Sequence, residues 1–210
     1  MRRRQVLQAL AALPVIGAAS PAPAQARNVG GEIAAAALAQ TRTRVVYDPA
    51  YVVLAYPGGD VPADRGVCAD VIIRALRKVG ADLQVLVHED MKANFAAYPK
   101  RWGLKKPDRN IDHRRVPNLE TFFTREGLRR ALTTAPANFR PGDVVSWNLK
   151  GDSGSLPHIG IVTARKARSG RPMVVHNIGA GVQHEDVLFQ WKMTGHFRIA
   201  PKVEEWDRES

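Results

Sequence analysis

The chain has 210 residues, with 31 lysines and arginines against 20 acidic residues, a formal net charge of +11 and one cysteine. This length suits a single domain with a substantial core. No segment reaches about 18 uninterrupted apolar residues, which argues against a transmembrane helix. The basic charge suits an anionic partner such as a cell-wall polymer or lipid headgroups. Nucleic acid is disfavoured, because no basic motif with interleaved aromatic residues is present.

Residues 1–26 are typical of an export signal. They combine a basic start, an apolar run and the small-residue cleavage site Ala24-Gln25-Ala26. Arg3 and Arg4 also suit the twin-arginine route, and general secretion stays open. We therefore expect the mature protein in the periplasm or cell envelope.

The remaining chain is predicted to place helices first and strands after. Helical periodicity marks 31–42, 67–79, 85–98 and 118–124, and alternating periodicity marks strands at 143–149, 158–166, 172–178 and 195–200. This order predicts an α+β domain with helices packed on one side of an antiparallel sheet. We assign 27–44 to an N-terminal helix and lead-in, 45–200 to the domain and 201–210 to a polar tail.

Cys68 lies in the first turn of the predicted helix 67–79. A single cysteine cannot form an intramolecular disulfide, so in an exported protein this thiol is either a small buried apolar group or a functional one. At a helix start the macrodipole and the free N–H groups stabilise a thiolate and can hold an oxyanion. We expect a lowered pKa for Cys68 and a position at the seam between helix and sheet.

His158 and His176 fall in consecutive predicted strands, where one can act as base to the cysteine and the other can orient it. A pairing with an even residue-number sum places His176 beside His158, and an odd sum places Asn177 there. Gly160 leaves open space beside the imidazole of His158, where a helix terminus can approach. The alternative is two ordinary strand histidines.

The stretch GDSG at 151–154 offers Ser153 as a rival nucleophile, because this motif surrounds the serine of trypsin-like peptidases. That fold consists mostly of strands and needs a histidine and an aspartate upstream of the serine. Here the upstream half is predicted to be helical, and neither His88 nor His113 lies in such a setting. We interpret GDSG as a turn.

The remaining clusters of acidic residues and histidines predict no metal or cofactor site. The triplet HED occurs at 88–90 and 184–186, which we interpret as helix-start capping and as a solvated turn. The segment 108–115, DRNIDHRR, is either a loop that contacts substrate or an ion-paired loop. No ligand spacing is typical of zinc.

Several separated blocks resemble one bacterial family. They are GVCADVIIRALRKVGADL, RNIDHRRVPNLETFF, PGDVVSW, HIGIVT and VVHN, and the resemblance extends over about 45–200. The family is called domain of unknown function 1287 and is placed among the papain-like amidohydrolases of the NlpC type. The resemblance implies a papain-like fold in which Cys68 is the nucleophile, His158 the base and His176 the orienting residue.

The chain departs from the NlpC pattern in two places. Ala69 and Asp70 follow the cysteine where serine and glycine are common, and the hairpin between the two histidines is longer than usual. Asn177 therefore stays an alternative third residue. Tyr56 and Asp70 are further candidates for substrate or oxyanion binding near the cysteine.

The leading hypothesis is an exported cysteine hydrolase that cleaves an amide bond, with the stem peptides of peptidoglycan as the expected substrate. A non-catalytic envelope-binding module on the same scaffold is the second hypothesis. An acyltransferase that uses the same cysteine and histidine is the third. The sequence does not distinguish oligomeric states.

Overall fold

The computed structural model describes residues 27–209, so the expected export signal lies outside the described residues. The helices in this part are α1 (Val29–Ala39), α2 (Cys68–Arg77), α3 (Leu83–Asn94), α4 (Val116–Arg125) and α5 (Ala200–Glu209), with short 3-10 helices at Gln40–Arg42, Phe95–Ala97, Asp112–Arg114 and Pro136–Asn138. The strands are β1 (Val46–Tyr47), β2 (Arg65–Gly66), β3 (Val144–Asn148), β4 (Pro157–Lys166), β5 (Pro172–Asn177), β6 (Val182–Glu185) and β7 (Lys192–Phe197).

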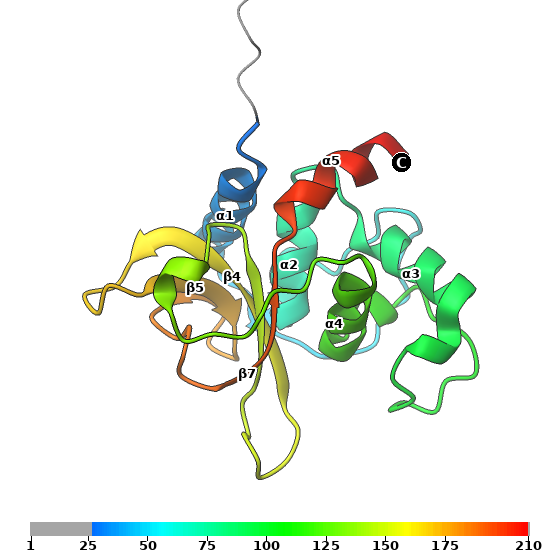
Figure 1. Ribbon diagram of the computed structural model, residues 1–210. Helices are drawn as coiled ribbons and strands as arrows, with labels where there is room; N and C mark the ends of the chain where they lie inside the picture. The colour runs from blue at the N-terminus through cyan, green and yellow to red at the C-terminus, as the bar shows by residue number, and fades with distance from the viewer. Residues whose placement is uncertain (1–26, 210) are drawn as a thin grey trace, which may run out of the picture.

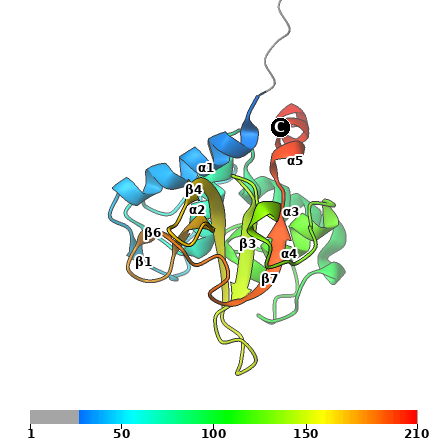
Figure 2. The same ribbon diagram turned by 60° about the vertical axis from the view of Figure 1, so that its left-hand side comes forward.

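The main sheet has β4 at its centre. The strand order is β6-β5-β4-β3-β7 and every neighbouring pair is antiparallel, while β1 and β2 form a separate parallel pair. Figure 1 shows α2, α3 and α4 gathered on one side of the strands, and Figure 2 shows α1 running above β4 and α2. The predicted α+β arrangement, with helices packed on an antiparallel sheet, is confirmed.

Apolar side chains cover both faces of the sheet. The larger group joins the helices to one face and includes Ile72 of α2 with Ile159 and Ile161 of β4. The smaller group, which includes Trp147 and Val162, covers the other face. Because side chains alternate along a strand, His158 projects on the face of Trp147, while Ile159 projects toward the helices. The hydrophobic effect therefore fixes which way each candidate residue on β4 points.

The end of the chain differs from the expected polar tail. Residues 200–209 form α5, whose Val203 and Trp206 are buried. The indole of Trp206 stacks on the ring of Phe122 in α4, with 5.7 Å between the ring centroids. Two apolar residues three positions apart lie on one helix face, so this otherwise charged segment packs against the domain.

Both HED triplets also differ from their interpretation. The triplet at 88–90 lies in the middle of α3, and the residue that caps this helix is Asp82, whose side chain accepts from the N–H of Gln84 at 3.0 Å. In the triplet at 184–186, His184 and Glu185 end strand β6, which the prediction missed.

Predicted strand 195–200 begins three residues earlier, at Lys192, and ends at Phe197. Within residues 27–209, no helix has the length and apolar character needed to cross a bilayer.

Candidate active site

A tight local arrangement fixes Cys68 at the start of α2. Val67 is extended, with φ −110° and ψ −177°, and its N–H donates to Oδ2 of Asp70 at 2.6 Å. A Cβ at Gly66 would lie 2.9 Å from the same oxygen, so the close approach requires glycine. Cys68 is the first residue of α2, which confirms its predicted place in the first turn, and it is only 4% exposed.

Asp70 is engaged in a buried ion pair. Its two carboxylate oxygens accept from Nε and Nη2 of Arg114, each at 2.9 Å, and both side chains are almost fully buried. The carboxylate therefore anchors the start of α2 and is not free to bind an oxyanion or a substrate group. Of the two interpretations of the segment 108–115, this contact supports the ion-paired loop.

Replacing Arg114 by methionine should destabilise the fold strongly, because it leaves the Asp70 carboxylate buried without a partner. The free energy of unfolding is expected to fall by about 3–5 kcal/mol, measured by urea denaturation. Arg125→Met is the matched control, since Arg125 pairs with Asp90 at the surface and should change stability much less. Equal losses in the two variants would contradict a structural role for the buried pair.

The antiparallel register of β4 and β5 brings the two histidines together. It pairs Gly160 with His176, an even residue-number sum, so His176 shares the face of His158. Nε2 of His158 lies 2.9 Å from Nδ1 of His176. A Cβ at Gly160 would lie 2.7 Å from Cγ1 of Val174 and 3.2 Å from Cβ of His176. The expected open space beside Gly160 is thus filled by β5.

Two tryptophans and a carboxylate surround the histidine pair. Trp147 stacks on the His158 ring at a centroid distance of 5.8 Å, and Trp191 contacts the His158 and His176 rings edge-on at 5.8 and 5.9 Å. Nε2 of His176 lies 3.0 Å from Oε2 of Glu185. Burial lowers the pKa of both histidines, to about 3 for His158, so both rings are neutral at pH 7.

Asn177 points to the opposite face of β5 from His176. Its buried Nδ2 donates to the carbonyl oxygen of Gly66 at 3.1 Å. Gly66 lies two residues before Cys68, so Asn177 holds the segment that leads into α2. The ring of His158 is bonded to His176 and not to Asn177, which favours His176 as the third residue.

The Cys68 thiol lies where α2 meets the beginning of β4. Burial raises its pKa to about 12, and the charge of Asp70 adds to this, although the backbone N–H groups of Ile159 and of the helix start hydrogen bond to the sulfur and lower the pKa. The expected lowering is wrong because the loss of hydration outweighs the helix start. Ile159 directly follows His158, yet among the described residues no hydrogen bond joins the thiol to either imidazole.

Alkylation of Cys68 should therefore be slow at neutral pH. With a raised pKa the reactive thiolate is a small fraction, and this fraction grows about tenfold per pH unit. At pH 7.5 we expect iodoacetamide to modify the folded protein at least about tenfold more slowly than the urea-unfolded chain, whose thiol has a pKa of about 8.5. Intact-mass measurement over a pH series tests this. A folded-state rate equal to the unfolded one would contradict it.

Tyr56 contacts α3 and Arg109, and none of these contacts is with the expected neighbour, Cys68. The hydroxyl of Tyr56 donates to Oε1 of Glu89 at 3.1 Å, on α3. The tyrosine that lies near Cys68 is Tyr47. Burial raises the pKa of Tyr47 to about 12, and a negative charge on Cys68 adds to this. Parallel pairing of β1 with β2 places Tyr47 opposite Gly66. Strands of two residues leave no periodic signal, so this neighbour was missed.

Ser153 lies in an exposed turn between β3 and β4. Its Oγ donates to the carbonyl oxygen of Lys150 at 2.7 Å, which is a local turn contact. The interpretation of GDSG as a turn is confirmed. The loop that contains it leads into His158.

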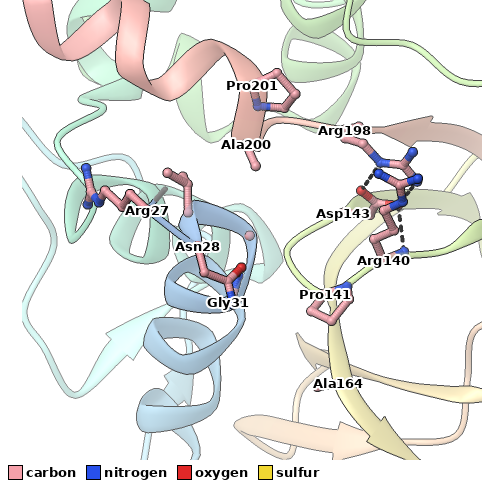
Figure 3. A pocket seen from close by; sticks show the side chains of 12 residues that line it. Arg27, Asn28, Gly31, Arg140, Pro141, Asp143, Ala164, Arg198, Ala200 and Pro201 are labelled. Atoms are coloured by element: carbon pink, nitrogen blue, oxygen red, sulfur yellow. Dashed lines mark hydrogen bonds and ion pairs between the residues drawn. The ribbon is translucent and has the colours of Figure 1, made fainter. Parts of the chain in front are cut away.

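A cavity of about 500 Å³ lies apart from these residues, between the start of α1 and the start of α5. Figure 3 shows Asp143 on its wall, bonded to Arg198 at 2.9 Å. Cys68, His158 and His176 do not line it. Within residues 27–209, no cluster of three or more histidine, cysteine, aspartate or glutamate side chains could hold a metal ion.

The model of the family described as domain of unknown function 1287 matches residues 34–199. The chain belongs to this family. A relative, the uncharacterized protein YijF of Escherichia coli (strain K12), is 58% identical over 175 residues, which are 83% of this chain and 84% of that protein. The resemblance seen in the separated sequence blocks is therefore confirmed for most of the chain.

Two solved structures resemble this chain in fold at low sequence identity. NlpC1 from Trichomonas vaginalis has a TM-score of 0.45 at 14% identity; the match covers 83% of this chain and 45% of that one, so this chain spans about half of its length. An N-acetylmuramoyl-L-alanine amidase from Bacteroides uniformis has a TM-score of 0.48 at 12% identity, and the match covers 81% of this chain and 99% of the other.

Proposed function

We propose that this family member is an exported cysteine hydrolase that cleaves an amide bond, with Cys68 as nucleophile, His158 as base and His176 as the orienting residue. The observation that supports the proposal is the buried hydrogen bond between His158 and His176. His158 lies at the start of β4, next to Ile159, whose backbone lies against the sulfur of Cys68, the one cysteine of the chain. A neutral imidazole next to an orienting partner is the form that accepts a thiol proton.

The chemistry would proceed through a thioester. As the sulfur attacks the carbonyl carbon, its proton passes to His158 and an electron pair moves to the carbonyl oxygen, which N–H groups at the start of α2 can stabilise. The C–N bond then breaks, and the leaving amine takes the proton from His158. Water attacks the thioester with the same imidazole as base, releasing the carboxylic acid and restoring the thiol. Substrate entry must first bring the sulfur within hydrogen-bond reach of the His158 ring.

We propose the stem peptides of peptidoglycan as the substrate. The signal-like segment 1–26 supports export to the compartment that holds the wall, and the net positive charge suits an anionic polymer. A hollow of about 500 Å³ lined by Trp191, Phe189 and Leu132 supports access from the β7 side, because Trp191 also contacts both imidazoles.

Digestion of purified peptidoglycan tests the substrate. The protein is incubated with intact wall and with isolated muropeptides, and the soluble products are identified by mass spectrometry. Fragments that carry one added water across an amide bond are expected. If the protein cleaves a generic peptide amide but leaves every muropeptide intact, the substrate is wrong and the thiol chemistry stands.

A non-catalytic wall-binding module is the second candidate. The raised pKa of Cys68 and the missing thiol–imidazole hydrogen bond among the described residues favour it. It predicts sedimentation of the protein with purified wall, no cleaved product, and unchanged sedimentation of Cys68→Ala.

A further inference from the structure

Strand β6 presents a carboxylate to the histidine pair. β6 pairs with β5 so that Val174 lies opposite Glu185 and His176 lies opposite Gln183. Glu185 is therefore the diagonal neighbour of His176 on the same face, within reach of a long side chain. Its Oε2 lies 3.0 Å from Nε2 of His176, and its side chain is 47% exposed while the imidazole is fully buried.

We propose that Glu185 is a positioning residue that sets the protonation pattern of both histidines and keeps Nδ1 of His158 free of a proton. An ionised carboxylate only accepts hydrogen bonds, so Nε2 of His176 must donate to it. In a neutral imidazole the other nitrogen, Nδ1, is then an acceptor. That nitrogen lies 2.9 Å from Nε2 of His158, which must therefore donate. The direction of the Glu185–His176 hydrogen bond therefore determines the direction of the His158–His176 hydrogen bond.

The consequence for catalysis, which rests on the proposed function, is that His158 has its lone pair at Nδ1 before any substrate arrives. A proton from Cys68 can enter at Nδ1 and leave from the same atom, with no change in the His176 ring. Without the carboxylate, the His158–His176 hydrogen bond has two possible directions. In the reversed one His176 donates to Nε2 of His158, and Nδ1 of His158 carries the proton and cannot act as base.

Glu185→Lys should reverse the direction of the His158–His176 hydrogen bond, because an ammonium group only donates. Glu185→Ala and Glu185→Gln should each leave a mixture of both directions, because alanine offers no partner and the glutamine amide can accept through its oxygen or donate through its NH2 group. Asp186→Lys is the matched control, since it makes the same charge change at the adjacent residue, whose carboxylate pairs with Arg171 instead. Because the side chain of Glu185 is half-exposed, these substitutions should not disturb the core. Circular dichroism checks the fold.

The primary readout is the tautomer of each ring in the purified protein, measured by long-range ¹H–¹⁵N NMR of the imidazole nitrogens. We expect Nδ1 of His158 to be unprotonated in the wild type and in Asp186→Lys. In Glu185→Lys we expect the same nitrogen to carry the proton. A wild type with a proton on Nδ1 of His158, or a pattern insensitive to Glu185→Lys, overturns the inference whether or not the protein hydrolyses amides.

Hydrolysis supplies the second readout. Glu185→Ala is expected to lower kcat/KM about tenfold, as for loss of an outer partner of a functional histidine, and Glu185→Lys should lower it further. Glu185→Gln should lower it by no more than Glu185→Ala does. If no variant hydrolyses any substrate, the proposed function fails while the NMR result still decides the role of Glu185.

Discussion

Replacement of Cys68 by alanine is expected to abolish amide hydrolysis, lowering kcat/KM at least about 10³-fold. The sulfur is the atom that bonds to the carbonyl carbon in the proposed chemistry, and no other cysteine exists in the chain to replace it. The measurement is the initial rate of product release from the substrate that the wild type cleaves. Activity of Cys68→Ala within about tenfold of the wild type would remove the thiol mechanism.

The control for this variant is Ser153→Ala, which tests the rival nucleophile directly. Ser153 makes a local turn contact and lies at the surface, so its loss should leave kcat/KM within about twofold of the wild type. Cys68 is buried, so thermal unfolding must show that Cys68→Ala keeps its fold. A large loss in Ser153→Ala together with an active Cys68→Ala would assign the chemistry to the serine.

Replacement of His158 by glutamine is expected to lower kcat about 10²–10⁴-fold, the usual contribution of a positioned general base. The glutamine amide can still hydrogen bond to His176 and pack between Trp147 and Trp191, but it cannot take the thiol proton. KM should change much less than kcat, because the proton transfer occurs after binding.

The control for His158→Gln is a second strand histidine. His184 on β6 lies 2.9 Å from Oγ1 of Thr163, and its register partner is Val175, whose side chain packs with the helix-facing core. His184→Gln should therefore keep kcat within about threefold of the wild type. Equal losses in the two variants would show that the strand histidines act through stability and not through proton transfer.

The sequence was sufficient for the parts of the site that follow from periodicity. Helical spacing after Val67 placed Cys68 at a helix start, and the alternation along β4 and β5 reduced the partner of His158 to two choices. The even register was not predictable from the pattern alone, because strand pairing depends on the turn between the strands and on both buried faces. The sequence blocks that resemble the family contain the same three residues, Cys68, His158 and His176, as candidates.

The surroundings of the site could not be predicted, because they depend on tertiary packing. Strand β6 has only four residues and follows a glycine-rich turn, so no alternating pattern in the sequence predicted that Glu185 reaches His176. The pKa of Cys68 moved opposite to the expectation because a helix start is visible in sequence, but burial is not. The segment that contains α5 has mostly polar residues, and the burial of Val203 and the contact of Trp206 with Phe122 show why it packs against the domain.

The last two residues of β5 serve the two halves of the site at once, since His176 bonds to His158 while Asn177 bonds to Gly66 ahead of Cys68. A one-residue deletion inside β5 would exchange their faces, so the ring and the helix entry would lose their supports together. The length of β5 should therefore stay constant in this family, because both supports depend on it.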